Sequence, residues 1–204
     1  MTELERCVNE LDCRGVTLAT NQDGKGLDSP EYFPFYEKVI KYDLPVLLQP
    51  TNWPGYPLVD PELGFNAMAI IGWPFDTTQA MWRLIFGGVL DHFPTLKIVT
   101  HHCGAMFPFF AKRIEMFGNA KLPRPFAEYC KNLYGDTALA GSVSACNCGY
   151  DFFGSERMMY GSDYPFGGKG AITGSLESVR AMKIPGTDTA QILGENARKM
   201  LKIK

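Results

Sequence analysis

The feature that most constrains the fold of this chain is a repeated alternation of short apolar runs with longer amphipathic stretches. Each apolar run is too short for a helix, and the residues after it carry apolar side chains at helical spacing. Strand followed by helix, five times over, predicts an α/β protein with a parallel sheet, because parallel strands need helical crossovers. The expected strands cover residues 16–20, 44–50, 96–102, 133–138 and 157–163.

Apolar side chains at helical spacing predict helices in the segments outside these strands. Some have recognisable starts, such as Asp28-Ser29-Pro30, where proline stands in an early helical position. The expected helices cover residues 3–13, 30–43, 76–91, 106–117, 175–182 and 189–203.

Two architectures fit a parallel sheet of this kind. An open doubly wound sheet needs about five strands, whereas a closed (β/α)₈ barrel needs eight and typically about 250 residues, with about 200 as the lower limit. The chain has 204 residues, so strand count and length alone favour the open sheet.

Composition excludes several classes of protein. A formal net charge of −2, with 46% hydrophobic and 21% charged residues, predicts one globular domain over residues 1–204 rather than a disordered chain. There is no basic run to bind nucleic acid and no apolar stretch of about 18 residues to span a membrane. The amino terminus lacks the apolar core of a signal peptide, so a cytoplasmic protein is expected. The six cysteines are therefore expected to be reduced thiols, and Cys146-Asn147-Cys148 is too closely spaced for a zinc knuckle.

Polar residues stand at the ends of three expected strands. Gln49 ends the second, His101 and His102 end the third, and Asp163 ends the fifth. Ligands bind at the carboxyl ends of parallel strands, so these residues are candidates for a site. Side chains alternate along a strand, so one histidine is expected to enter the site while its neighbour faces the helices. A site and a pair of ordinary strand caps are equally compatible with this pattern.

Four segments resemble motifs of one family, in the correct order. The segment 96–109, followed by Arg113, resembles the H-x-G-x(3)-P…R motif of the amidohydrolase-related family, in the branch of the aminocarboxymuconate-semialdehyde and resorcylate-type decarboxylases. Residues 160–166 resemble its G-[ST]-D-[YW]-P signature. Residues 73–78 and 87–97 are similar to the helical stretch that leads into the histidine strand, and 191–201 to the closing helix. A mild departure is Cys103, where the family often has glycine.

The resemblance reverses the preference for an open sheet. It implies a (β/α)₈ TIM barrel with one divalent metal, usually zinc, of which the five recognised strands are strands four to eight. The family's H-x-H or E-x-H pair on strand one has no counterpart, because the only histidines are His92, His101 and His102. The chain is therefore expected to be a partial or atypical barrel, and a truncated product, a fragment and a degenerate member all remain open.

The resemblance also implies roles for individual residues. Asp163 takes the position of a metal ligand that shares in catalysis, and His102 that of the acid/base residue. His102, not His101, is accordingly expected to face Asp163. Gln49 falls where the family has a metal-binding histidine, and an amide oxygen is a weak ligand, which leaves the ligand set incomplete. Arg113 and Trp53 are candidates for substrate binding.

The expected activity is decarboxylation or hydrolysis of a small aromatic or unsaturated carboxylic acid by a metal-dependent enzyme. The alternative is a catalytically silent barrel that functions in assembly or ligand binding, which the missing strand-one pair and Gln49 favour. A partial barrel would expose two sheet edges and part of its interior, so a homo-oligomer is expected.

Overall fold

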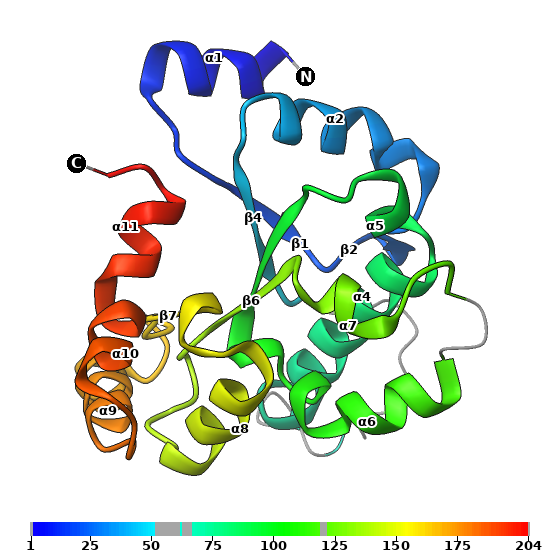
Figure 1. Ribbon diagram of the computed structural model, residues 1–204. Coiled ribbons are helices and arrows are strands. Elements are labelled where there is room, and N and C mark those ends of the chain that lie inside the picture. Colours follow the sequence, from blue (N-terminus) through cyan, green and yellow to red (C-terminus); the bar gives the residue numbers. More distant parts are fainter. Residues whose placement is uncertain (1, 52–61, 63–66, 119–121, 204) are drawn as a thin grey trace.

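The computed structural model of the chain describes residues 2–51, 62, 67–118 and 122–203 (Figure 1). Its centre is a parallel sheet in which the order of the strands follows their order in the chain. A doubly wound sheet would reverse direction at a switch point, and this sheet does not, so the arrangement is that of consecutive barrel strands. The strands are β1 (Val16–Ala19), β4 (Pro45–Gln49), β5 (Lys97–Thr100), β6 (Leu133–Asp136) and β7 (Met158–Met159).

Helices pack mainly against the face of the sheet that carries Val46 and Leu48, and the sequence prediction missed two of them. One of these begins where the Ser142 hydroxyl accepts a hydrogen bond from the Ala145 amide, and it ends at Gly154, whose φ is 70°. The expected helix 76–91 is divided at Gly88, which has a φ of 80°. The helices are α1 (Thr2–Leu11), α2 (Phe33–Lys41), α4 (Trp73–Phe86), α5 (Val89–His92), α6 (Phe107–Gly118), the missed α7 (Phe126–Cys130) and α8 (Val143–Phe153), α9 (Gly168–Arg180), α10 (Gly186–Ala190) and α11 (Asn196–Met200).

The two faces of the sheet have different environments. In β4, Val46 and Leu48 are buried in the hydrophobic core that the sheet forms with the helices, whereas Leu47 on the opposite face is 37% exposed. In the described part of the chain, β1 pairs along the sheet only with β4, and β7 only with β6. The face that carries Leu47 is thus partly open, and β1 and β7 end the sheet with no further strand beside them among the described residues, as expected for part of a barrel.

All five strands are shorter than expected, and β5, β6 and β7 lose the most residues at their carboxyl ends. β5 ends at Thr100, because His102 and Cys103 have φ near +50° and turn the chain. β7 ends at Met159, because the next amide, that of Tyr160, donates to the carbonyl of Ile192 instead of continuing the sheet. The residues that follow each strand are therefore placed by loop geometry rather than by strand alternation.

The helices are not of the kind that cross membranes. In the part of the chain that the structure describes, none combines the length and apolar character needed to span a bilayer.

A buried carboxylate ties together the ends of the first two strands. Asp76, in the first turn of α4, is 3% exposed. Its Oδ2 accepts hydrogen bonds from the Thr20 hydroxyl and, at 3.0 Å, from the Thr51 amide. Burial raises the pKa of Asp76, although the bonds from Thr20, Thr51 and Asn21 oppose the shift. Asp76 therefore links the loops that follow β1 and β4.

Replacing Asp76 by alanine is expected to lower the free energy of unfolding by about 2–4 kcal/mol, because the buried Thr20 hydroxyl loses its acceptor and the half-buried Thr51 amide loses one of two. Urea denaturation would measure the change. Glu10, which is exposed on α1, provides the control, and its replacement by alanine should cost less than about 0.5 kcal/mol. Equal losses in the two variants would contradict the role assigned to Asp76.

Candidate functional site

Two histidines, His101 and His102, directly follow the carboxyl end of β5. After Thr100 the chain enters a short 3₁₀ turn, in which His102 has φ 51° and ψ 39°. This left-handed conformation is uncommon for a residue with a side chain. Because the backbone turns here, the two side chains do not point to opposite faces as they would in a strand. The rings of His101 and His102 lie beside each other with their centroids 4.0 Å apart.

Asp163 reaches these rings from the segment after β7. Gly161 in this segment passes against Asp136, and a Cβ on Gly161 would lie only 3.0 Å from that of Asp136. The hydroxyl of Thr137 accepts a hydrogen bond from the Gly161 amide at 3.1 Å, which fixes the segment against the end of β6. Asp163 itself has a φ of 59°. Glycine is thus required at position 161, because the segment that carries Asp163 passes so close to Asp136.

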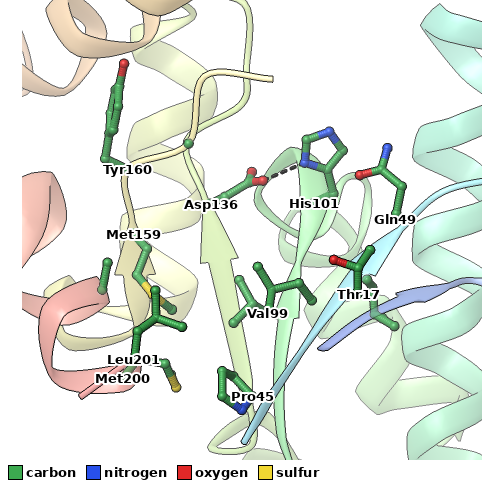
Figure 2. Close-up of a pocket in the computed structure, with 14 residues that line it drawn as sticks. Thr17, Pro45, Gln49, Val99, His101, Asp136, Met159, Tyr160, Met200 and Leu201 are labelled. Atoms are coloured by element: carbon green, nitrogen blue, oxygen red, sulfur yellow. Dashed lines mark hydrogen bonds and ion pairs between the residues drawn. The ribbon is translucent and has the colours of Figure 1, made fainter. Parts of the chain in front are cut away.

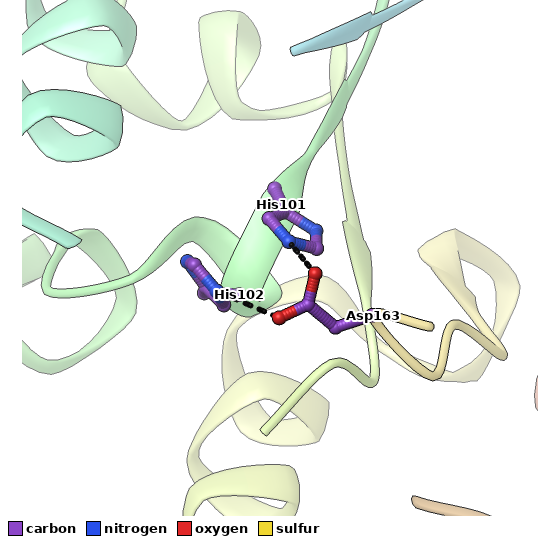
Figure 3. Close-up of side chains that lie close together, drawn as sticks. All are labelled: His101, His102 and Asp163. Atoms are coloured by element: carbon purple, nitrogen blue, oxygen red, sulfur yellow. Dashed lines mark hydrogen bonds and ion pairs between the residues drawn. The ribbon is translucent and has the colours of Figure 1, made fainter. Parts of the chain in front are cut away.

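Both histidines contact Asp163 (Figure 3). The Nε2 atom of His101 lies 3.0 Å from one carboxylate oxygen, and Nε2 of His102 lies 3.7 Å from the other. One possible ligand atom from each of the three residues lies within 4.8 Å of the others. The expectation that His102 alone would face Asp163 is therefore wrong, because the turn after Thr100 brings His101 even closer.

Asp136, at the end of β6, completes the cluster. Its Oδ2 lies 2.6 Å from Nδ1 of His101, and its Oδ1 accepts hydrogen bonds from the amides of Cys103 and Ala138, both at 3.1 Å. Sequence reasoning missed Asp136 because the expected strand ran on to residue 138. The strand-end argument that selected Gln49 and Asp163 would have found it.

The two imidazoles have opposite pKa shifts. Burial would lower the pKa of His101, but the hydrogen bond and charge of Asp136, together with Asp163, outweigh it and raise the pKa. For His102, burial and then the neighbouring charge of His101 lower the pKa, against the opposing charges of Asp136 and Asp163. His102 is therefore the imidazole that remains neutral at neutral pH.

The cluster separates two cavities. The larger, of about 680 Å³, is bounded by His102 and Asp163 and by two aromatic side chains, Trp73 and Phe166. These two rings meet edge to face, with centroids 6.0 Å apart. The smaller, of about 260 Å³, lies on the open face of the sheet and contains His101, Asp136 and Gln49 (Figure 2). Asp163 is 30% exposed, so the cluster is open to small molecules.

The structure brings only some of the predicted site residues together. Gln49 lines the same cavity as His101, at the ends of the strands (Figure 2). Arg113 is exposed on α6, where its guanidinium stacks over Phe117, and it lines neither cavity of the cluster. Trp53 lies outside the described residues.

Cys103, the departure from the family motif, packs into the core. It is buried, and its sulfur lies where a Cβ on Gly149 would be placed. Burial raises the pKa of this thiol well above its usual value. It therefore stays protonated, and a protonated thiol is not a metal ligand. All six cysteines are free thiols.

The donor set fits a divalent cation. Two imidazole nitrogens and a carboxylate oxygen are a common three-residue set for a catalytic metal, with further positions left for water and substrate. His101 has the arrangement typical of a ligand, because the ring nitrogen that faces away from Asp163 bonds to a carboxylate. The buried Nδ1 of His102 has no hydrogen-bond partner among the described residues. His101 and Asp163 are thus better suited than His102 to hold a metal.

Known proteins share this sequence and fold. The chain is 31% identical over 207 residues to the 2-amino-3-carboxymuconate-6-semialdehyde decarboxylase of Dictyostelium discoideum, covering 98% of this chain and 56% of that protein. The crystal structure of 5-carboxyvanillate decarboxylase from Sphingomonas paucimobilis matches with a TM-score of 0.87 at 28% identity, over 100% of this chain and 62% of that one.

A further relative was crystallised with a metal. A dihydroxybenzoic acid decarboxylase from Polaromonas sp. JS666, with bound manganese and the inhibitor 2-nitroresorcinol, matches with a TM-score of 0.82 at 26% identity, over 99% of this chain and 64% of that one. The chain thus spans between about half and two thirds of the length of these relatives. Its sheet corresponds to part of the TIM barrel of such decarboxylases.

The sequence profile of the amidohydrolase family matches residues 1–203. With the parallel strands in chain order and the site at their carboxyl ends, this match shows that the chain belongs to the amidohydrolase family.

Proposed function

We propose that this chain carries the site of a metal-dependent decarboxylase or hydrolase acting on a small aromatic or unsaturated carboxylic acid. The observation that carries the proposal is the convergence of His101, His102 and Asp163 at the carboxyl ends of the strands. Relatives that cover nearly the whole chain are named as decarboxylases of acids of this class, which supports the reaction type.

Asp163 and His101 are proposed to hold the cation, because their ligand atoms are the closest pair, at 3.0 Å. Gln49 lines the adjoining cavity and could add a neutral amide oxygen. A bound divalent metal would polarise a substrate oxygen or lower the pKa of a water. Manganese is the ion named in a relative's structure, and zinc is the usual ion of the family, so both belong in the tests.

His102 is proposed to transfer the proton. A neutral imidazole accepts a proton at Nε2 and can return it, which is general acid–base catalysis. In decarboxylation Nε2 of His102 would first take a proton from water or from the substrate's carboxyl group. The bond from carbon to the carboxyl group then breaks, CO₂ leaves, and the carbon that keeps the electron pair receives this proton. In hydrolysis the same nitrogen would take a proton from water.

The cavity beside His102 supports an unsaturated, planar substrate. Trp73 and Phe166 wall it with aromatic rings, which favour stacked or edge-to-face contact with another π-system. Arg113 is exposed on α6 and does not line this cavity, so it could pair with a substrate carboxylate only at a site that a second chain completes.

CO₂ release from 5-carboxyvanillate, 2,6-dihydroxybenzoate and related acids, with Mn²⁺ or Zn²⁺ added, tests the proposal. We expect turnover of at least one acid, lost on removal of the metal by a chelator. Metal binding without turnover of any acid, and without hydrolysis of the corresponding esters and amides, would instead support the silent barrel. Because the chain spans only part of its relatives, the assay should include any upstream coding sequence.

Self-association is proposed on the open surfaces of the fold. β1 offers a sheet edge without a neighbouring strand among the described residues, and α6 exposes Phe109 to 75% and Phe117 to 68%. Such surfaces rarely persist on monomers. Sedimentation as a monomer at micromolar concentration would contradict this proposal.

A further inference from the structure

We propose that Asp136 is a positioning residue that sets the tautomer and orientation of His101, so that Nε2 of His101 presents its lone pair to a metal held with Asp163. The part of this inference that concerns metal binding rests on the proposed function. Neither Asp136 nor His101 was among the residues that the family motif points to.

Asp136 is itself rigidly held. Its Oδ1 accepts the amide hydrogens of Cys103 and Ala138, and these donors belong to the turn after β5 and to the end of β6. The other oxygen, Oδ2, is thereby directed at His101, whose Nδ1 lies 2.6 Å away. The side chains of Asp136 and His101 are 16% and 11% exposed, so water competes little for this bond.

The bond to Asp136 favours one of the two tautomers of His101. Both ring nitrogens face carboxylate oxygens, which only accept hydrogen bonds: Nδ1 lies 2.6 Å from Asp136 and Nε2 lies 3.0 Å from Asp163. A neutral ring has one proton, and the shorter contact, to the carboxylate that two backbone amides hold in place, favours Nδ1 as its donor. Nε2 is then unprotonated, and a cation bound by Nε2 and Asp163 would remove the repulsion between their lone pairs. Metals bind the unprotonated nitrogen, and an outer carboxylate of this kind both orients the ring and makes it more basic.

His102 provides the internal comparison. Its Nε2 also faces Asp163, at 3.7 Å, but its buried Nδ1 has no partner among the described residues. Its tautomer is therefore not set by a carboxylate. Of the two neighbouring imidazoles, only His101 has the support that metal ligands usually have.

Asp136→Asn tests the inference with almost no change of shape. The two backbone amides would retain the side-chain oxygen, so the new NH₂ group would face Nδ1 of His101. As a donor, this group favours the tautomer with the proton on Nε2, which cannot bind a metal. We expect Mn²⁺ affinity, measured by calorimetry, to fall about 10- to 100-fold.

The second readout needs neither metal nor activity. In ¹⁵N-histidine NMR spectra of the metal-free protein, recorded at alkaline pH where the imidazoles are neutral, His101 should carry its proton on Nδ1 in the wild type and on Nε2 in Asp136→Asn. The chain has three histidines, so a His101→Gln spectrum assigns the signal.

Asp91→Asn is the matched control. Asp91 accepts hydrogen bonds from Tyr129 and Arg124 and lines neither cavity of the cluster. The Asp91→Asn substitution should change neither the tautomer of His101 nor the Mn²⁺ affinity.

An unchanged tautomer in Asp136→Asn, or unchanged affinity in that variant beside a wild type that binds Mn²⁺, would overturn the inference. A wild type that binds no Mn²⁺ would contradict the proposed function instead, and the tautomer result would still decide the role of Asp136.

Discussion

Asp163→Ala is expected to weaken Mn²⁺ binding by more than about 100-fold, beyond the loss typical of an outer-shell partner, and to remove turnover. Asp163 is the carboxylate of the group that it forms with His101 and His102, and both imidazoles face its oxygens. Without it, His101 alone would remain of the two proposed ligands, and no negative charge would face the cation from position 163. Calorimetry with Mn²⁺ and the CO₂ assay measure the two effects.

The neighbouring variant Ser162→Ala controls for disturbance of the loop, and thermal unfolding controls for the fold. Asp163 is partly exposed, so its truncation should leave a folded protein. Retention of wild-type Mn²⁺ affinity by a folded Asp163→Ala variant would rule out this residue as a ligand.

His102→Gln is expected to lower kcat by about 10²- to 10⁴-fold, the usual contribution of a general acid–base residue. Mn²⁺ affinity should change by less than about tenfold, because His101 and Asp163 hold the ion. The effects on kcat and on Mn²⁺ affinity differ because His102 lines the cavity with Trp73 and Phe166, whereas His101 lines the other cavity.

His92→Gln is the matched control, since His92 is on α5 and packs against Phe33 outside both cavities. If His102→Gln lost Mn²⁺ affinity as severely as Asp163→Ala, His102 would be a metal ligand and another group would have to transfer the proton.

The sheet was predictable from sequence because its signal is local and strong. Short apolar runs such as 16–20 and 133–138 can be buried only as strands, and chain order gives their neighbours once a barrel is recognised. Asp163 was predictable because its strand-end position agrees with a family motif. The helix α8 was missed although Ser142 and Gly154 mark its ends.

His101 could not be assigned from sequence. Strand alternation would separate it from His102, and the rule fails only because the strand stops at Thr100. The left-handed conformations of His102 and Cys103 depend on tertiary packing and on the amide bond that Cys103 donates to Asp136. No spacing rule predicts a positive φ at such residues.

Asp136 was hidden for a related reason. The apolar run continues beyond it, so the end of β6 is set by contacts of Thr137 with Gly161 rather than by composition. With His101 and Asp136 left out, the sequence indicated an incomplete ligand set. The structure adds one imidazole and the carboxylate that supports it.

Anomalous diffraction from crystals of the chain soaked with Mn²⁺ tests the proposed metal site most directly. We expect one strong peak within coordination distance of both Nε2 of His101 and a carboxylate oxygen of Asp163, with Asp136 still bonded to Nδ1 of His101. The absence of a peak at Asp163, or a peak coordinated by His102 and Gln49 without His101, would rule out the proposed ligand pair.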